Sequence, residues 1–319
     1  MAFLEEALKG VARRAAANAE EVSLFFAEGF SPLAKDRRGD KPSAHVNHQL
    51  PVLSFRRADG KIPDRRVGEY FGIEQFEQFS PRLGARPLRR KRIIERTSDR
   101  ITYRDGLGVL RQEQTAGSRT IPHFLEFPIR DRASWEPFKG RLHTRMAERV
   151  NLKDLPEQIR NIKARNYVMD VWGGSALGMI RNWIGFENIC LMIHDQPELL
   201  DEVIRTVGDV AEGAARLYFE NGLPVDRVSW WEDIAFKNGP MVSPKFFREK
   251  CGPVYKRVMG WYARCGASYG IVDCDGDMRG LVPAWLENGV NIMFPLEVAS
   301  GVHPVDLRRQ FPGIRMMGG

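Results

Sequence analysis

The chain has 319 residues, of which 43% are hydrophobic and 28% charged, so it is long enough to bury a large core and is neither disordered nor fibrous in composition. No apolar run approaches the roughly 20 residues of a membrane span, the N-terminal segment carries Glu where a secretory signal would carry only positive charge, and the four cysteines show no CxxC spacing. These features predict a cytoplasmic protein with reduced thiols and no membrane partner.

The net charge of +7 is unevenly distributed along the chain. Residues 1–150 hold 29 Lys and Arg against 20 Asp and Glu, whereas residues 151–319 hold 19 against 21. The densest basic stretch, Arg82 to Arg96, is not surrounded by a recognisable nucleic-acid module, and its aromatic residues do not alternate with its charges. We therefore expect no nucleic-acid partner. A solvated basic face and a site for an anionic ligand both explain these residues.

The first part of the chain differs in pattern from the rest. Apolar residues at helical spacing predict an amphipathic helix over residues 2–28, and the charged, Pro- and Gly-containing residues 31–49 predict a linker. A short strand is expected at Leu50 to Phe55. We therefore expect an atypical N-terminal helix and linker over residues 1–49, followed by one domain over residues 50–319.

Two further segments precede the regular part of the chain. An apolar stripe at helical spacing predicts a helix over residues 67–79. Residues 91–114 alternate apolar and polar side chains in short runs broken by turn residues, which predicts antiparallel strands in a small excursion at the edge or mouth of the main fold. His123 begins a short apolar segment. Either it donates a proton to a substrate, or it is a histidine within a strand whose hydrogen-bonding groups are all paired.

From Tyr167 onward, strands alternate with helices, including helices over residues 195–222 and 242–266. Three strands end in acidic residues, and the strand ending at Trp172 runs into glycines that allow a ligand or another backbone to approach. Repeated βα units predict an α/β fold with a parallel sheet, here a (β/α)8 or TIM barrel, whose strand ends open on one face. The acidic ends are Glu232 and Asp233; Asp273, Asp275 and Asp277; and Glu297.

These acids define the predicted site. Strand alternation places Asp273 and Asp275 on one face and Cys274 on the other. With Glu232 or Asp233 and Glu297, they would gather oxygens suited to a hard divalent cation or to general acid/base catalysis, although Asp residues at strand ends also serve as caps and turns.

Other polar and aromatic residues accompany the acids. Lys237 has two possible roles. It pairs with a carboxylate of the site or of a ligand, or it forms a salt bridge at the surface. Trp172, Trp230 and Trp231 are apolar surfaces near strand ends, and one of the two consecutive tryptophans is expected in the core and the other at the pocket. The predicted catalytic residues are thus Asp273, Asp275, Glu232 and Asp233, and the predicted substrate-binding residues are Trp231, Lys237, Glu297, Trp172 and His123.

The segments WWEDIAFKNGPMVSPKFFREKCGPVYKRV and IVDCDGDMRGLVPAWLENGVNIMFPLEVASGVHPVDLRRQFPGIRMMGG resemble the uroporphyrinogen decarboxylase superfamily, in its methyltransferase-like and uncharacterised branch. VGEYFGIEQFEQF, TIPHFLEFPIRDRASWEPFK and VWGGSALGMIRNWIGFEN are similar to the same branch, so the resemblance covers roughly residues 67–319. It implies a (β/α)8 barrel with its site at the strand ends. Residues 1–66 depart from the family's opening, and the family's last helix has no counterpart here, so incomplete ends are expected.

The site also departs from the family pattern. Authentic uroporphyrinogen decarboxylases share an arginine-rich, RQAGRY-type motif near the N-terminus. This sequence contains no such motif. In coenzyme M methyltransferases of the superfamily, a His-x-Cys pair before Gly-Asp binds zinc; aligned on Gly276 and Asp277, those positions are Asp273 and Asp275 here. A zinc site built from His and Cys is therefore disfavoured, while a divalent metal held by the two aspartates stays open.

The resemblance implies an enzyme, and three functions stay open at this point. The first is methyl transfer in a corrinoid-dependent demethylation system, with a small-molecule substrate, a separate corrinoid protein and a second copy of the chain as partners. The second is decarboxylation of a porphyrinogen or another polycarboxylate, as in porphyrin biosynthesis. The third is a non-catalytic or truncated binding protein.

Overall fold

The structure is a computed structural model that describes residues 21–26, 51–56, 76–115, 121–143, 146–163 and 167–318. The chain divides into two compact units, Met1–Gln75 and Phe76–Gly319.

In the first unit, β1 (Glu21–Phe26) pairs antiparallel with β2 (Pro51–Arg56). β2 confirms the short strand expected at Leu50 to Phe55. The helix predicted over residues 2–28 is wrong at Glu21–Phe26. The sequence EVSLFF fits a period of two as well as a helical period, and pairing with β2 stabilises the strand. The remainder of that helix and the linker expected over residues 31–49 lie outside the described residues.

The second unit is built on a six-stranded sheet in which every neighbouring pair is parallel. The order of strands in space follows their order in the chain, without the reversal that marks a doubly wound sheet. In space the strands are β14 (Arg315–Met316), β13 (Ile292–Phe294), β12 (Tyr269–Asp273), β9 (Arg227–Trp231), β8 (Val168–Gly174) and β3 (Phe76–Phe79).

This sheet confirms the α/β fold with a parallel sheet. It is not closed among the described residues, because β3 and β14 are its two edges. Closure into a barrel therefore stays a prediction. β3 also shows that the helix predicted over residues 67–79 is wrong at Phe76–Phe79, where four residues pair in register with β8; residues 67–75 lie outside the described residues.

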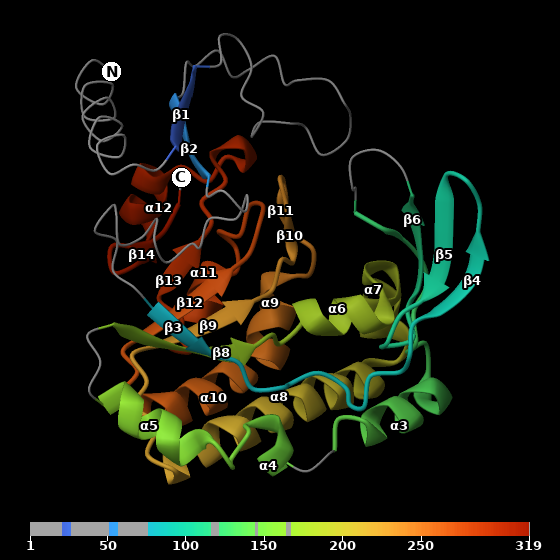
Figure 1. Cartoon of the computed structure of the whole chain (residues 1–319), viewed down its shortest axis with the longest axis horizontal. Coiled ribbons are helices and arrows are strands. Elements are labelled where there is room, and N and C mark those ends of the chain that lie inside the picture. The colour runs from blue at the N-terminus through green and yellow to red at the C-terminus, as the bar shows by residue number, and fades with distance from the viewer. Residues whose placement is uncertain are drawn as a thin grey trace. The chain divides into compact units, whose positions relative to one another are not determined.

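Helices connect the parallel strands. Figure 1 shows α8 and α10 side by side along one side of the sheet, and they confirm the long helices predicted over residues 195–222 and 242–266. Trp230 of β9 is buried against α10, with its ring centroid 4.6 Å from that of Tyr255. The connecting elements are α6 (Gly178–Ile184), α7 (Phe186–Asp195), α8 (Pro197–Glu220), α9 (Pro244–Phe246), the π-helical turn η1 (Phe247–Cys251), α10 (Gly252–Arg264), α11 (Val282–Leu286), the 3-10 turn η2 (Val298–Ser300) and α12 (Pro304–Gln310).

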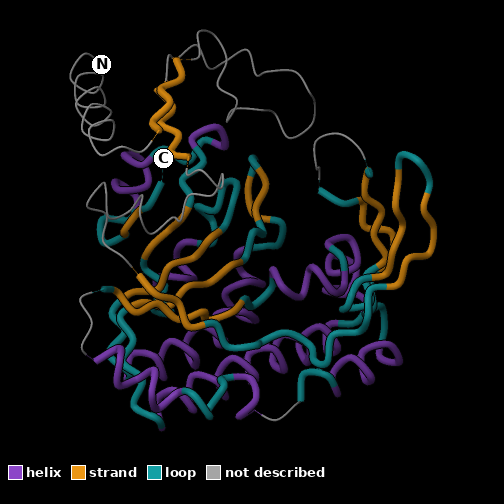
Figure 2. Tube along the Cα trace, in the orientation of Figure 1, coloured by secondary structure: helices purple, strands orange, loops and turns teal. Residues whose placement is uncertain are grey.

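An antiparallel four-stranded sheet lies between β3 and β8 in the chain, and it confirms the predicted excursion (Figure 2). Its order is β4-β5-β6-β7, and among the described residues three helices follow it before the chain returns to β8. These elements are β4 (Arg92–Arg96), β5 (Arg100–Arg104), β6 (Leu110–Gln114), β7 (His123–Glu126), α3 (Arg132–Gly140), α4 (Met146–Arg149) and α5 (Leu155–Lys163).

A two-stranded hairpin, β10 (Ala235–Phe236) and β11 (Gly239–Pro240), follows β9. Within the described ranges, none of the helices combines the length and the apolar character needed to cross a membrane.

Candidate functional site

The ends of β8, β9, β12 and β13 meet at one edge of the parallel sheet, because parallel strands all end on the same side. In the register of the sheet, Asp273 at the end of β12 pairs with Trp231 of β9 and with Phe294 of β13. Asp233 follows β9 by two residues, and Glu297 follows β13 by three. The predicted convergence of acidic strand ends is therefore present at this edge.

Three of the acids interact electrostatically. Asp273 is partly buried, and this burial raises the pKa of its carboxyl; the neighbouring carboxylates of Asp275 and Asp233 raise it further. Among the described residues, no hydrogen-bond donor contacts the Asp273 side chain. Asp273 therefore holds a proton more readily than an ordinary aspartate does.

Asp277, four residues further along, is in the opposite situation. Its carboxylate accepts hydrogen bonds from the Arg279 side chain at 2.8 and 2.7 Å, and these bonds lower the pKa of Asp277. One short loop thus holds one carboxyl whose pKa is lowered and another whose pKa is raised. Such a divergence of environments is how proteins separate acid and base roles.

Cys274 is fully buried, whereas Asp273 and Asp275 on either side of it are partly exposed, so the predicted alternation is confirmed. Burial raises the pKa of the Cys274 thiol to about 12, which keeps the thiolate needed for zinc binding scarce. Within the described ranges, no group of three or more His, Cys, Asp or Glu side chains is arranged to hold a metal ion. The described residues of this edge therefore do not fit a metal centre with three protein ligands.

Asp233 has an unusual backbone. Its φ of 48° lies in the left-handed region, which costs a non-glycine residue roughly 1 to 3 kcal/mol and is often found at functional sites. Arg181 of α6 donates hydrogen bonds to the Asp233 carbonyl oxygen and, at 3.4 Å, to its carboxylate. The Arg181 guanidinium also lies 5.4 Å from the ring centroid of Trp231. Arg181 is thus a cation of the site that the sequence analysis missed, and nothing in its helical surroundings distinguishes it.

Glu232 is completely buried and fully hydrogen-bonded. Burial raises the pKa of this carboxyl, and its hydrogen bonds oppose that rise. A side chain with no exposed surface cannot contact a substrate, so the geometry gives Glu232 a positioning role that ties the end of β9 to the segment between β8 and α6 and to α10. Its donors are the backbone N–H groups of Ala176 (2.5 Å), Leu177 (2.9 Å) and Gly178 (2.7 Å) and the hydroxyls of Ser175 (3.2 Å) and Tyr255.

Glu297 also holds a loop. Its carboxylate accepts a hydrogen bond from the Gly276 backbone N–H at 2.9 Å and one from the Ser300 hydroxyl at 3.2 Å. Gly276 has φ of 85°, and a Cβ added there would lie 2.6 Å from the Ala235 carbonyl oxygen, so only glycine fits between this loop and β10. Glu297 therefore fixes the loop that carries Asp275 and Asp277.

Trp230 is buried in the core, as expected for one of the two consecutive tryptophans. Trp231 is partly exposed beside Arg181, and its place at a pocket stays a prediction. Trp172 is likewise half-buried, at the irregularity where β8 shifts register against β9. Lys237 is exposed in the turn between β10 and β11.

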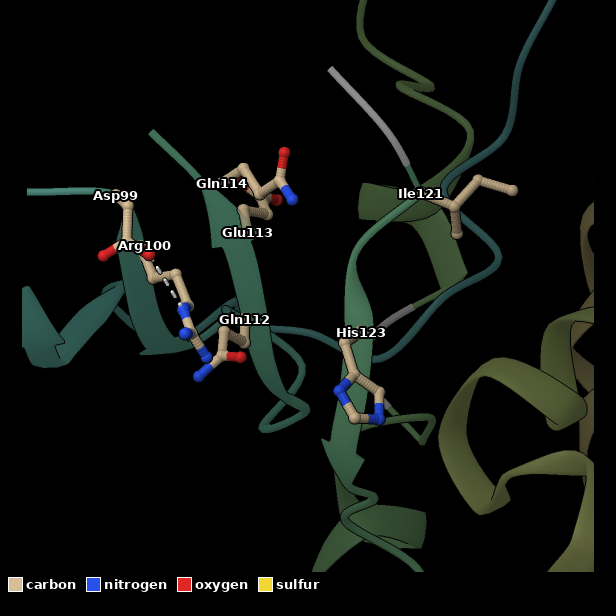
Figure 3. A pocket seen from close by; sticks show the side chains of 7 residues that line it. All are labelled: Asp99, Arg100, Gln112, Glu113, Gln114, Ile121 and His123. Atoms are coloured by element: carbon tan, nitrogen blue, oxygen red, sulfur yellow. Dashed lines mark hydrogen bonds and ion pairs between the residues drawn. The ribbon is translucent and has the colours of Figure 1, made fainter. Parts of the chain in front are cut away.

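His123 lies apart from these residues in the fold, on β7 of the antiparallel sheet. Its imidazole lines a pocket of about 460 Å³ whose other lining residues come from the β4–β5 turn, β5, β6 and the segment before β7 (Figure 3). The structure thus places His123 and the acids on different sheets. The other lining residues are Asp99, Arg100, Gln112, Glu113, Gln114 and Ile121.

No family model matches the chain, and no curated protein matches it. Among solved structures, four chains match, including a methyltransferase from Methanosarcina mazei with 11% sequence identity and a TM-score of 0.40. The match covers 65% of this chain and 58% of that protein, so the chain spans less than two thirds of the neighbour's length. A likeness at this level carries no inference about activity.

Proposed function

We propose that the protein is an enzyme that removes a methyl group from a methoxylated or methylamine-type small molecule, with Asp273 as the proton donor. The observation that carries the proposal is the environment of Asp273, whose pKa is raised by burial and by the carboxylates of Asp275 and Asp233. A carboxyl with a raised pKa keeps its proton to a higher pH than an ordinary carboxyl does, which suits it to general-acid catalysis.

In the demethylation of a methyl ether, the bond between the methyl carbon and the oxygen breaks, and the methyl group passes to an acceptor. The leaving oxygen takes the proton of Asp273, which regains a proton from solvent. Trp231, which pairs with Asp273 in the register of the sheet, offers apolar surface beside this position, and Trp172 offers more near the end of β8. Glu232 and Glu297 keep the surrounding loops in place through the hydrogen bonds described above.

The acceptor in this proposal is a corrinoid carried by a separate protein, which supplies a strongly nucleophilic cobalt centre.

We also propose that the parallel sheet belongs to a (β/α)8 barrel of the uroporphyrinogen decarboxylase type and that the protein is a cytoplasmic homodimer. Support for the barrel comes from the strand order, because a sheet that winds in one direction without reversal curves toward closure.

The test is methyl transfer from methoxylated aromatic compounds and methylamines to reduced cobalamin, followed by absorbance. We expect transfer with at least one donor, and we expect Asp273→Asn to lower the rate by about 10² to 10⁴, the usual contribution of a general acid. Asp209→Asn on α8, which removes an exposed carboxylate that pairs with Arg257, is the matched control and should leave the rate unchanged. Failure with every donor would count against methyl transfer.

Arg181 favours decarboxylation as a second candidate. Its guanidinium, held through Asp233 beside the acid cluster, could bind one carboxylate of a substrate while Asp273 protonates the carbon that loses carbon dioxide. Incubation with uroporphyrinogen separates the two proposals. Carbon dioxide release that depends on both Arg181 and Asp273 supports decarboxylation, and no release removes it.

A further inference from the structure

The outer edge of the antiparallel sheet presents apolar side chains to solvent. β4 is the edge strand, its five residues are all exposed, and among the described residues it pairs only with β5. Ile93 and Ile94 are 50% and 52% exposed, and Leu88, just before the strand, is 53% exposed. We call residues Leu88–Arg96 the β4 edge.

The three apolar residues of the β4 edge belong to one continuous border of the sheet. The Arg89 backbone N–H donates a hydrogen bond of 2.9 Å to the Gly106 carbonyl oxygen, so the segment before β4 runs on along the β5–β6 turn. A bulge between Ile93 and Glu95 interrupts the pairing with β5 and leaves consecutive isoleucines in solvent. Bulged, charged edges resist the addition of another strand, so a partner would contact side chains here rather than backbone.

Cations surround this apolar centre. Residues 82–104 contain nine Lys and Arg but only two acids, Glu95 and Asp99, and the second of these pairs with Arg100. Arg89, Arg90, Arg92 and Arg96 form no ion pair with another described residue. Lys91 lies over the Tyr103 ring at 3.3 Å from its centroid.

We propose that the β4 edge docks an acidic protein partner, through an apolar centre of Leu88, Ile93 and Ile94 and a rim of arginines. Interfaces of this kind pair buried apolar anchors with complementary charges at the border. A nucleic acid fits less well, because aliphatic side chains have no counterpart on a phosphate backbone, and the aromatic residue of this border, Tyr103, is buried beneath Lys91 and offers no face for base stacking. This proposal is independent of the chemistry proposed above.

The test uses the full chain and a fluorescein-labelled synthetic peptide in which Glu and Leu alternate, with fluorescence anisotropy as the measurement. We expect binding that weakens as salt rises. Arg92→Glu/Arg96→Glu and Ile93→Ser/Ile94→Ser should each raise the Kd by about tenfold or more, because one removes the charges and the other the anchors. Circular dichroism checks that these exposed positions leave the fold intact.

Arg160→Glu/Arg205→Glu is the matched control, since it changes the net charge equally but on the exposed surfaces of α5 and α8. Its Kd should stay within about twofold of the parent. The proposal is overturned if the peptide does not bind, if the control variant weakens binding as much as the β4 variants do, or if a Lys-Leu peptide or polyuridylate binds more tightly than the acidic peptide.

Discussion

Asp273 and Asp277 lie four residues apart, yet their surroundings move their pKa values in opposite directions. We predict that 13C NMR of the aspartate carboxyls finds Asp273 titrating above the ordinary value. Asp275→Asn should lower the pKa of Asp273, because it removes a like charge, but burial should keep that pKa above the ordinary value. Asp277→Asn is the control, since Asp277 is neutralised by Arg279, and an equal shift in that variant would contradict the proposed coupling.

The buried carboxylate of Glu232 gives a second prediction. In Glu232→Gln, one oxygen becomes an amide NH2 that faces backbone N–H donors, so at least one hydrogen bond is lost and two donors oppose each other. We expect the free energy of unfolding to fall by about 3 kcal/mol. Urea denaturation measures this, with the exposed Glu187→Gln on α7 as the control; a loss no larger than that of the control would refute the positioning role.

The sign of the pH effect at Glu232 follows from the direction of its pKa shift. Because burial raises the pKa of the folded carboxyl, the folded state holds its proton more readily than the unfolded chain does. This group therefore favours folding most below the unfolded pKa, and its contribution is lost as pH rises through the folded pKa. The same direction applies to Asp273.

At single positions, the sequence indicated which residues lie together at the strand ends, but it did not indicate the role of each one. Strand alternation correctly separated Cys274 from Asp273 and Asp275. The position of Glu232 next to Asp233 gave no sign that Glu232 is buried, because its partners are backbone N–H groups of a loop that is more than 50 residues away in the chain. Arg181 was missed for the same reason, since its partner Asp233 is distant in sequence.

At the scale of elements, the contact between α6 and the end of β9 requires glycine. A Cβ at Gly178 would lie 2.0 Å from the Glu232 carbonyl oxygen, so Gly178→Ala must separate the two elements. We expect a loss of about 3 kcal/mol or more in the free energy of unfolding. Gly260→Ala in α10, where no atom lies within 4 Å of the added Cβ, should instead gain about 0.5 to 1 kcal/mol. Thermal denaturation measures the change in stability of each variant. If both variants lost stability or both gained it, this account would be contradicted.

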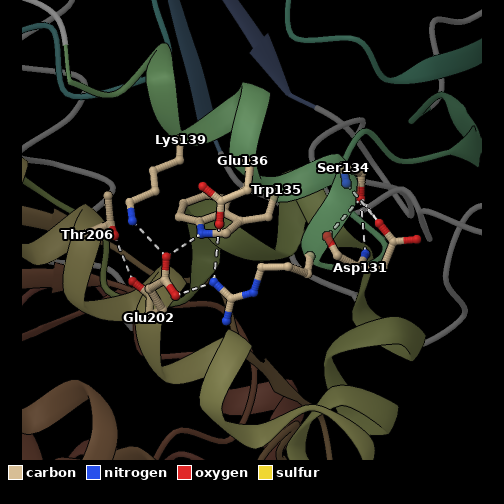
Figure 4. Close-up of polar contacts among 8 residues, drawn as sticks. Asp131, Ser134, Trp135, Glu136, Lys139, Glu202 and Thr206 are labelled. Carbon is tan, nitrogen blue, oxygen red and sulfur yellow. Dashed lines mark hydrogen bonds and ion pairs between the residues drawn. The ribbon is translucent and has the colours of Figure 1, made fainter.

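Three side chains of helix α3 form hydrogen bonds with one carboxylate of α8 (Figure 4). Glu202 of α8 accepts hydrogen bonds from the Lys139 ammonium at 2.8 Å, from the Trp135 indole at 2.9 Å and from the Arg132 guanidinium. The Lys139, Arg132 and Trp135 hydrogen bonds lower the pKa of Glu202 to about 2. The carboxylate therefore contributes to stability above its unfolded pKa of about 4.3, and the contribution is lost as pH falls toward 2.

We predict that Glu202→Gln lowers the free energy of unfolding by about 1 to 2 kcal/mol at pH 7, because two charge-assisted hydrogen bonds are weakened. At about pH 2 the difference from the parent should disappear. Denaturation across this pH range measures both values, and Glu220→Gln, at the exposed end of α8, should show little effect throughout. A difference that persists unchanged at low pH would show that the carboxylate charge is not its cause.

Elements with a long, consistent period were predicted well, and short ones were not. The helix over residues 195–222 is α8, with Pro197 in its first turn, because 24 residues of helical period leave little ambiguity. The apolar residues near Phe76 fit a helix or a strand equally, and pairing with β8, which lies more than 80 residues later, determines the outcome. The π-helical turn η1 before α10 was not predicted, since no residue type signals such a turn.

For the molecule as a whole, the sequence predicted a parallel sheet with its polar residues at one edge, and the structure confirms this. The sequence placed a domain start at residue 50, from the end of a polar linker, and that boundary stays a prediction; the compact unit that holds the parallel sheet begins at Phe76. Local composition marks loops, but the extent of a unit depends on long-range contacts, such as the pairing of β3 with β8.

The second unit should therefore fold by itself. Every residue of its hydrophobic core lies between Leu83 and Ile314, and β3 completes its sheet from Phe76 onward. All seven tryptophans of the chain lie after Phe76, so tryptophan fluorescence reports on this unit alone, both in the full chain and in a fragment Phe76–Gly319. We predict cooperative urea unfolding of the fragment with the midpoint of the full chain, because a change in midpoint at constant slope measures a change in stability. A lower midpoint, or the lack of a cooperative transition, would mean that residues before Phe76 stabilise the parallel sheet and that the chain folds as one unit.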